Sequence, residues 1–336
     1  MTTTPQDHVE HYWAHGYAVI RGLFSPAEMQ AVQAESQRVY AEGLKHHATY
    51  RDRNVLFEIL PESFAGQRYV LQAHWVAWFS PLFEQIRRDP RVLAVMAPLL
   101  GQDIKQVAQQ IHWKPPGATR RTGYRFHQDL RFRDRHDVYE DLMTSYINTG
   151  LAIDPATTAN GCLRIFPNSH QRGYLGLSDD GPIMKGSTQD HELIAAGLDP
   201  ATAVDIELAP GDLALWGLLT VHGSNANHST KDRAFAIQSY VRAASSQRGE
   251  WAFRDGQSVP LGAEPQICKY EQLHDKPGPF YSDDRWFESE DGGSADGPVQ
   301  TESLQMRDIH ESIKEADAAE FATDEQVKAV FGKYGA

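Results

Sequence analysis

YRFHQDL, at residues 124–130, places His127 and Asp129 two positions apart. On an extended strand, residues i and i+2 point to the same side, so both side chains can reach one ion. On a helix they would diverge by roughly 200°, and the pair would fail. A second histidine, His222, lies far downstream. Two imidazoles and one carboxylate are the ligands with which non-haem Fe(II) oxygenases hold their metal on one face, which leaves the other face open for a co-substrate and O2. We therefore predict that distant strands bring His127, Asp129 and His222 together as a catalytic metal site.

A lone His-x-Asp triplet is weak evidence, because a chain with 15 histidines is expected to contain one by chance. The alternative interpretation is a pair of surface residues on a strand. Arg233, eleven positions after His222, favours the metal site over that alternative. An arginine holds a carboxylate through two parallel hydrogen bonds, and a dicarboxylate co-substrate needs such a partner at its far end.

The composition is that of an ordinary soluble enzyme. The chain has 336 residues, of which 41% are hydrophobic and 23% charged. A net charge of −13 argues against nucleic acid as a partner, since phosphate binding requires clustered Lys and Arg. Two cysteines, Cys162 and Cys268, cannot form a disulfide framework and fit a reducing compartment. No signal peptide and no apolar run of ~20 residues is present, so we expect no membrane partner and a cytoplasmic protein.

Short strand-like runs separated by turn residues dominate the middle of the chain. They are Ile104–Trp113, Thr144–Ile153, Cys162–Phe166, Val204–Leu208, Leu213–Trp216 and Phe235–Val241. Residues before 104 read as mainly helical, with one short strand at Tyr17–Ile20. Many short strands after helices predict a mainly β fold with flanking helices, either an antiparallel barrel or a sandwich.

Two helices have clear start signals in the N-terminal part. Ser25, Pro26 and Glu28 form the pattern of a capping box with proline in the first turn. Asp89-Pro90 starts a second helix, and Gly101 is its expected stop.

The predicted organisation is one oxygenase domain at 1–290 and a polar tail at 291–336. Within the domain, residues 1–103 form the helical part and 104–245 the strand core, and 171–203 read as an insertion that could cover the mouth of a site. The tail returns to helix with a capping box at Thr323–Gln326. It docks either on the main domain or on a neighbouring subunit, so a homo-oligomer remains open.

Five segments carry a resemblance to a known family. They are Lys114–Gly117, His127–Leu130, Asn160–Leu163, Pro167–His170 and Pro210–Arg233. Together they resemble the phytanoyl-CoA dioxygenase (PhyH) family of Fe(II)/2-oxoglutarate-dependent oxygenases. One departure is Asn168, where the family usually has glycine; asparagine tolerates left-handed backbone angles, so the turn can survive.

The resemblance implies a double-stranded β-helix, the jelly-roll or cupin-like fold, in which His127, Asp129 and His222 bind Fe(II). It implies that Arg233 pairs with the distal carboxylate of 2-oxoglutarate, and that Gln110 and Ser224 match co-substrate contacts by position. Thr149 is a looser match, because the loop before Asn160 differs in length. The implied reaction uses O2 to hydroxylate an aliphatic C–H of a small molecule, with release of succinate and CO2; desaturation and ring formation stay open. Related halogenases carry a small residue at the position of Asp129, which this chain does not.

Six arginines surround the metal motif in an otherwise acidic chain. They are Arg120, Arg121, Arg125, Arg131, Arg133 and Arg135. One interpretation is a site for an anionic substrate, and the other is surface pairing with Asp134, Asp137, Glu140 and Asp141. For the site as a whole, a zinc hydrolase using the same three ligands and a non-catalytic 2-oxoglutarate-binding protein are the rival hypotheses. The first gives no account of Arg233, and the second does not require an intact triad.

Overall fold

The computed structural model describes residues 5–60, 62, 66–116, 123–133, 139–179, 183, 187–265 and 278–281. The chain divides into two units, Met1–Asp283 and Asp284–Ala336, and every described residue lies in the first. The predicted tail at 291–336, with its capping box at Thr323–Gln326, therefore lies outside the described residues. In the part that is described, no helix has both the length and the apolar character that a membrane crossing requires.

Helices are few and short, and strands make up most of the regular structure. The α-helices are α1 Pro5–His15, α2 Pro26–Gly43, α4 Pro81–Ile86, α5 Pro90–Leu100, α6 Leu142–Ser145 and α7 Asp190–Ala195. The 3-10 turns are η1 Val76–Trp78, η2 Asp129–Phe132, η3 Thr158–Asn160, η4 Ser169–Arg172, η5 Pro200–Thr202 and η6 Ala243–Ser245. The strands are β1 Tyr17–Ile20, β2 Tyr50–Asp52, β3 Val55–Leu60, β4 Tyr69–His74, β5 Ile104–Lys114, β6 Tyr124–His127, β7 Tyr146–Ala152, β8 Leu163–Ile165, β9 Val204–Ile206, β10 Leu213–Gly217, β11 His222–Ser224, β12 Arg233–Arg242, β13 Glu250–Arg254, β14 Gln257–Ser258 and β15 Phe280–Tyr281.

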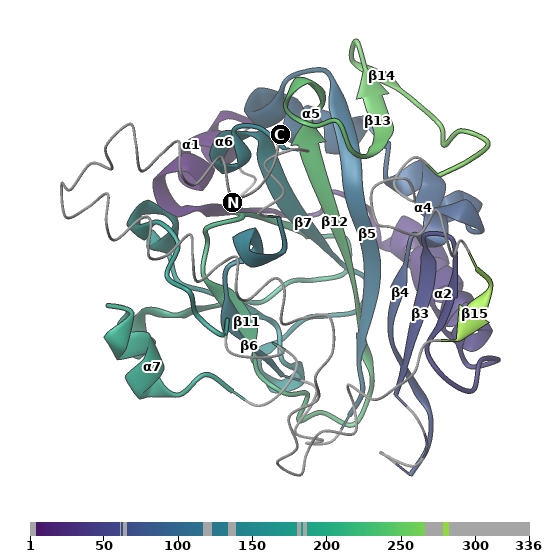
Figure 1. Cartoon of the computed structure of the whole chain (residues 1–336), viewed down its shortest axis with the longest axis horizontal. Helices are drawn as coiled ribbons and strands as arrows, with labels where there is room; N and C mark the ends of the chain where they lie inside the picture. Colours follow the sequence, from purple (N-terminus) through teal and green to yellow (C-terminus); the bar gives the residue numbers. More distant parts are fainter. Residues whose placement is uncertain are drawn as a thin grey trace, which may run out of the picture. The chain divides into compact units, whose positions relative to one another are not determined.

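Two antiparallel sheets form the core of the fold. The larger sheet has the order β1-β10-β7-β12-β5-β4-β3-β2-β15, with β13 and β14 attached beside β5 (Figure 1). The smaller sheet has the order β6-β11-β8-β9. Strands that are neighbours in space are mostly distant in sequence, as the pairing of β12 with both β5 and β7 shows. This is the double-stranded β-helix predicted from the sequence.

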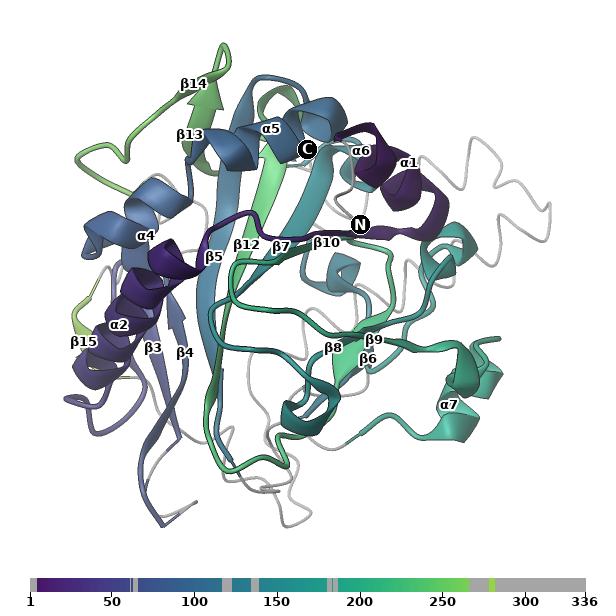
Figure 2. The same ribbon diagram turned by 180° about the vertical axis from the view of Figure 1, so that it is seen from behind.

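Helices α1, α2, α4 and α5 cover one face of the larger sheet (Figure 2). Their apolar side chains and those of the sheet form the main hydrophobic cluster, which includes Met29 and Val39 of α2, Met96 of α5, and Phe57 and Ile111 of the sheet. Burial of these side chains is the main favourable contribution to folding. The helices close one face of the sheet, so the other face is the one available to the smaller sheet and to a site between the two.

The predicted helix starts are confirmed. Ser25 accepts a hydrogen bond from the backbone N–H of Glu28, and the Glu28 carboxylate accepts from the backbone N–H of Ser25 at 2.8 Å, which is the reciprocal capping box. Asp89 caps α5 through the N–H of Arg91, and the helix ends at Gly101 with φ of 87°.

The prediction of a mainly helical region before residue 104 is wrong for residues 50–74. Strands β2, β3 and β4 lie there and extend the larger sheet beyond β5. The turn between Asp52 and Val55 has only two residues, with Arg53 at a left-handed φ of 54°. Arginine is not a typical residue for such a turn, so the hairpin lacks the Asn-Gly or Asp-Gly signal that reveals most short hairpins.

The insertion at 171–203 contains α7 and η5. Its Leu177, Leu193 and Leu198 pack with Phe126 and Val221, neighbours of the predicted metal ligands. The insertion thus covers the smaller sheet beside the site, and its role as a moving lid stays a prediction. Just before it, Asn168 has a φ of 65°, so the asparagine adopts the left-handed turn predicted for it.

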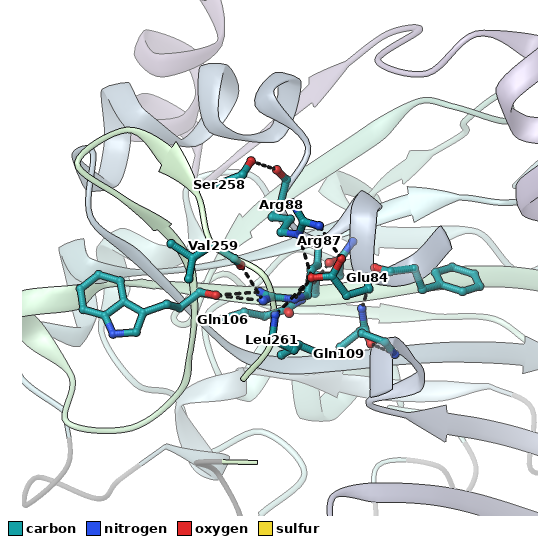
Figure 3. A network of polar contacts seen from close by, with 12 residues as sticks. Glu84, Arg87, Arg88, Gln106, Gln109, Ser258, Val259 and Leu261 are labelled. Atoms are coloured by element: carbon teal, nitrogen blue, oxygen red, sulfur yellow. Dashed lines mark hydrogen bonds and ion pairs between the residues drawn. The ribbon is translucent and has the colours of Figure 1, made fainter. Parts of the chain in front are cut away.

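A buried arginine, Arg87, links the end of α4 to β13 and to the residue that follows β14. Arg87 is 0% exposed, and its guanidinium donates to the carbonyl oxygens of Trp251 at 2.9 and 3.0 Å and of Val259 at 3.0 Å (Figure 3). Its own carbonyl accepts from the Tyr240 hydroxyl at 2.8 Å. The next residue, Arg88, instead makes a half-exposed pair with Glu84 on the same helix.

We predict that Arg87→Ala lowers the free energy of unfolding by about 2–5 kcal/mol, because two buried carbonyl groups lose their donors. Arg88→Ala is the matched control, with a loss below about 1 kcal/mol expected for a partly exposed helix pair. Urea unfolding followed by circular dichroism measures both. Equal losses in the two variants would contradict the structural role given to Arg87.

Candidate metal centre and active-site cavity

The pairing of β6 with β11 brings the two predicted histidine ligands face to face. In this antiparallel pair His222 lies directly opposite His127, and the two imidazole rings are 4.3 Å apart between centroids. Asp129 begins the turn η2, two residues beyond the end of β6. The residue between, Gln128, has φ of −118° and ψ of 130°, so the backbone is still extended and the aspartate projects to the same side as His127.

The three side chains converge on one point. Nε2 of His127 lies 3.4 Å from Oδ1 of Asp129, and Nε2 of His222 lies 3.3 Å from Oδ2. All three ligand atoms lie within 4.8 Å of one another. Ligands that each bind one ion at ~2.1 Å are separated by roughly 3 Å, so the arrangement fits a single metal ion.

Backbone carbonyls orient both imidazoles. Nδ1 of His127 lies 2.8 Å from the carbonyl of Arg125, and Nδ1 of His222 lies 2.9 Å from that of Thr220. Each Nδ1 therefore carries the proton, which leaves the lone pair of Nε2 directed at the metal position. Burial lowers the pKa of His222 to about 4, so this ring is neutral at pH 7, as a metal ligand must be.

Asp129 is held as a carboxylate by donors from the larger sheet. Its Oδ2 accepts from Nδ2 of Asn148 at 2.7 Å and from Nε1 of Trp216 at 3.2 Å. Asn148 is fixed in turn by the Ser239 hydroxyl at 2.6 Å. Burial acts to raise the pKa of Asp129, but the adjacent imidazoles bring it well below its ordinary value. The neutral imidazoles and the carboxylate are thus ligands that suit a divalent transition metal.

Gln128 positions the motif through the side of the strand that faces away from the metal. Its Nε2 donates to the carbonyls of Gly173 and Leu219, both at 2.8 Å, and its Oε1 accepts from the N–H of Leu175. All three bonds are directed at neighbouring loops. The glutamine therefore links the metal motif to the start of the insertion.

Two buried cations lie close to each other in the same cavity. Nζ of Lys114 donates to the carbonyl of Gly161 at 3.1 Å, to the hydroxyl of Ser224 at 2.7 Å and to the carbonyl of Asn225 at 2.6 Å. Arg233 donates through Nη2 to the same Gly161 carbonyl at 3.1 Å. Gly161 has φ of 72°, and a Cβ there would collide with the carbonyl oxygen of Asn225, so this junction requires glycine.

No described carboxylate forms an ion pair with either of these cations. Burial and the charge of Arg233 lower the pKa of Lys114 well below its ordinary value, and burial lowers the pKa of Arg233. Nε of Arg233 is buried and has no hydrogen-bond partner among the described residues. Buried cations without counter-charges are unfavourable. A bound carboxylate would supply both the missing charge and the missing acceptor.

A cavity of about 470 Å³ joins the metal triad to the two cations. Strand alternation explains its lining: every second residue of β5 and β12 faces it, from Ala108 to Lys114 and from Arg233 to Ser239. β7 contributes Asn148 and β10 contributes Trp216. Residues from both sheets therefore form one chamber with the metal position on its wall.

Comparison with known proteins agrees with this geometry. Residues 12–235 match the family described as Phytanoyl-CoA dioxygenase (PhyH). The chain belongs to this family. It is therefore a dioxygenase, as predicted.

Relatives of this PhyH-family chain include two proteins named for phosphonates. Methylphosphonate hydroxylase of Gimesia maris is 24% identical over 261 residues, which cover 76% of this chain and 87% of that protein. 2-Aminoethylphosphonate dioxygenase of an uncultured bacterium is 26% identical over 262 residues, which cover 76% and 88%. The structure of EctD from S. alaskensis with 2-oxoglutarate and 5-hydroxyectoine has a TM-score of 0.56 at 20% identity and covers 77% of this chain and 89% of that one, which supports the fold.

Of the three further residues predicted to contact the co-substrate, two line the cavity and one does not. Gln110 and Ser224 line the cavity with Arg233. Thr149 does not appear among the lining residues; its hydroxyl donates to the carbonyl of Gln238 at 3.0 Å. Asn148, one residue earlier, occupies the inward position of β7. The structure therefore gives no support to a co-substrate contact by Thr149.

Several residues that build the site were not predicted from the sequence, namely Lys114, Asn148, Trp216 and Ser239. Lys114 had a detectable signal, because Gln110 and Lys114 are four residues apart on one strand and so share a face. Asp212, in contrast, has a structural role in a turn: it accepts from the backbone N–H groups of Gly22 and Ala209.

The arginine cluster separates into two groups. Arg125 pairs with Glu192, and Arg131 lies 3.7 Å from Asp179, so both bind acidic residues of the insertion. Arg133 instead lines the cavity, with Nε donating to the Tyr146 hydroxyl at 2.8 Å. Arg120, Arg121 and Arg135 lie outside the described residues.

For the metal centre we predict that Asp129→Ala or His222→Ala weakens Mn(II) or Fe(II) binding by about 100-fold or more, and that Asn148→Ala weakens it by about 10–100-fold, as expected for a residue that orients a ligand. His228→Ala, at an exposed position near His222, is the control and should bind normally. Anaerobic calorimetric titration measures all four. Metal binding at full affinity by either ligand variant would exclude this triad as the site.

Proposed function

We propose that this chain is an Fe(II)- and 2-oxoglutarate-dependent dioxygenase that hydroxylates an aliphatic C–H of a small molecule, with release of succinate and CO2. The observation that carries the proposal is the joint lining of one cavity by a His/Asp/His triad and by two buried cations that have no carboxylate partner among the described residues. Membership of the PhyH family and the 2-oxoglutarate named in the EctD structure support it.

The residues that line the cavity have separate tasks. His127, Asp129 and His222 would hold Fe(II), and Arg233 would hold the distal carboxylate of 2-oxoglutarate through Nε and its remaining N–H groups. Ferrous iron with 2-oxoglutarate supplies the oxidising chemistry, in which O2 is split and 2-oxoglutarate is converted to succinate and CO2. Lys114 anchors Ser224 beside Arg233 and adds a second positive charge at that end of the cavity.

The zinc hydrolase alternative accounts for the triad but not for the cations. A hydrolytic zinc site needs three ligands and one bound water, and it has no need for a buried Arg233 and Lys114 in the same chamber. A non-catalytic 2-oxoglutarate-binding protein would need the cations but not two imidazoles with free Nε2 lone pairs. The dioxygenase accounts for both ends of the cavity.

The substrate that we propose is a small anion held by Arg133. This arginine lines the cavity and uses Nε on Tyr146 and Nη1 on the carbonyl of Phe132, while no bond of Nη2 to a described residue is present. Charge-assisted hydrogen bonds from arginine suit carboxylate and phosphonate groups. The phosphonates in the names of the two relatives support an anionic substrate.

Anaerobic addition of Fe(II) and 2-oxoglutarate to the wild-type protein is predicted to produce the weak visible charge-transfer band of a chelated complex. Arg233→Met should raise the Kd for 2-oxoglutarate by roughly 100-fold, since a charged hydrogen-bond donor is lost. Arg254→Met, at an exposed position, serves as the control. Absence of the band in the wild-type protein, or oxygen-independent hydrolysis with Zn(II), would contradict the proposal.

Arg133→Met is predicted to weaken binding of an anionic substrate by roughly 10–100-fold, the usual loss for a charged hydrogen bond. Arg131→Met is its matched control, because Arg131 lies two residues away and contacts Ser178 and Asp179 instead. The measurement is the Kd of alkylphosphonates, determined under anaerobic conditions with Fe(II) and 2-oxoglutarate bound. Equal affinities in the two variants would remove Arg133 from the substrate site.

A further inference from the structure

A second polar region lines the cavity on the side of β3, β4 and β5, which lie side by side (Figure 1). It consists of Glu58, Gln72, His74, Gln110 and His112, with Tyr124 of β6 facing them. None of these side chains is a metal ligand. The region therefore forms a chamber wall that the proposed chemistry leaves without a task, apart from the predicted co-substrate contact of Gln110.

Hydrogen bonds connect most of the side chains of this wall, and the donor and the acceptor of each bond can be assigned. Nε2 of Gln110 lies 3.4 Å from Nδ1 of His74, and Oε1 of Gln110 lies 2.8 Å from Nε2 of His112. The amide donates to His74 and accepts from His112, so His74 carries its proton on Nε2 and His112 carries its proton on Nε2. Burial lowers the pKa of both histidines to about 3, and both rings are neutral at pH 7.

The remaining bonds follow from these proton positions. The Nε2–H of His74 donates to Oε1 of Gln72 at 3.0 Å, and Nδ1 of His112 accepts from the Tyr124 hydroxyl at 2.9 Å. Each imidazole nitrogen, both polar atoms of the Gln110 amide and the tyrosine hydroxyl thus have a partner. The wall is complete without a ligand, with one exception.

The exception is the Glu58 carboxyl group. Its Oε2 is buried and has no hydrogen-bond partner among the described residues. Its Oε1 lies 3.7 Å from Nε2 of His74, longer than a hydrogen bond, and that proton already serves Gln72. Burial raises the pKa of Glu58 to about 7, although the charge of Arg51 opposes this. The Glu58 side chain lines the cavity and is 16% exposed, so its carboxyl group is positioned to accept a hydrogen bond through Oε1 from a donor that enters the cavity.

We infer that the substrate is a zwitterion, with an ammonium or similar N–H donor bound by Glu58 and an anionic group bound by Arg133. This inference rests on the proposed function, which assigns the anionic group to Arg133. The cavity then presents charges of opposite sign to the two ends of one molecule. A neutral or purely anionic substrate would leave Glu58 without a partner.

The distance between Glu58 and Arg133 indicates that several carbon atoms separate the two charged groups of the substrate. Glu58 lies on β3, and Arg133 contacts Tyr146 on β7, four strand-to-strand steps away. At ~4.8 Å per step this is roughly 19 Å measured along the curved sheet, and the two side chains and the curvature shorten the direct path. Charges on adjacent atoms cannot reach both groups. An ω-amino acid with several intervening carbons fits better than an α-amino acid.

Calorimetric titration of the anaerobic Fe(II)–2-oxoglutarate protein tests this without turnover. The probes are aminomethyl-, 3-aminopropyl- and 5-aminopentylphosphonate, each beside the alkylphosphonate that lacks only the amine. We expect at least one of the longer amino probes to bind at least tenfold more tightly than its partner, and the aminomethyl probe to show no such preference. Wild-type protein that prefers none of the amino probes would overturn the inference.

Glu58→Gln is the specific variant, because it keeps the size of the side chain and removes its charge. It should abolish the amine preference while leaving the affinity for the plain alkylphosphonates unchanged, and the latter result also shows that the cavity is folded. Glu62→Gln, an exposed glutamate four residues away, is the control and should keep the preference. A preference that survives in Glu58→Gln would assign the amine to another group and refute the role of Glu58.

Failure of this inference is distinguishable from failure of the proposed function. If the visible band forms and alkylphosphonates bind in an Arg133-dependent manner without amine preference, only the zwitterion inference fails. If the band does not form, the dioxygenase proposal fails first.

Discussion

The antiparallel pairing of β6 and β11 is the constraint on which the site depends. It sets His222 opposite His127, and β11 is fixed from its other side as well, by β8. A slip of one residue would turn the histidine to the other face of the strand, so the register decides whether a metal site exists. Gln128 and the carbonyls of Arg125 and Thr220 then orient the ligands, and Asn148 and Trp216 of the larger sheet hold the carboxylate between them. Both sheets are therefore needed for one ion.

The charged side chains in the cavity are positioned to bind ligands rather than to pair with one another. Among the described residues, Lys114 and Arg233 at one end have no carboxylate partner, and a buried oxygen of Glu58 has no donor; the ionised Asp129 faces the metal position. A buried charge without a counter-charge is unfavourable, so Lys114, Arg233 and Glu58 each gain when a partner of opposite charge binds. The alternation of side chains along a strand supplies the positions, since alternate residues of β5 and β12 face the same chamber. The jelly roll thus has a hydrophobic core on one face of the larger sheet and the polar cavity on the other face only.

The sequence predicted those parts of the protein that depend on local spacing. His127 and Asp129 are two residues apart, and the capping box of α2, the Asp89 cap of α5 and the proline in the first turn of each helix are local as well. Contacts between residues on different strands could not be predicted from the sequence, such as those of Asn148 with Asp129 and Ser239. The prediction of Thr149 shows why: β7 is buried on both faces along its whole length, so no alternation of polar and apolar residues reveals which side faces the cavity. Strands β2 to β4 were missed because a turn through Arg53 lacks a recognisable hairpin signal.

The most direct test of the account is an anaerobic crystal structure of the wild-type protein with Fe(II) and 2-oxoglutarate. We predict one iron bound by Nε2 of His127, a carboxylate oxygen of Asp129 and Nε2 of His222, with the distal carboxylate of 2-oxoglutarate on Arg233. Iron bound elsewhere, or 2-oxoglutarate bound away from Arg233, would contradict it.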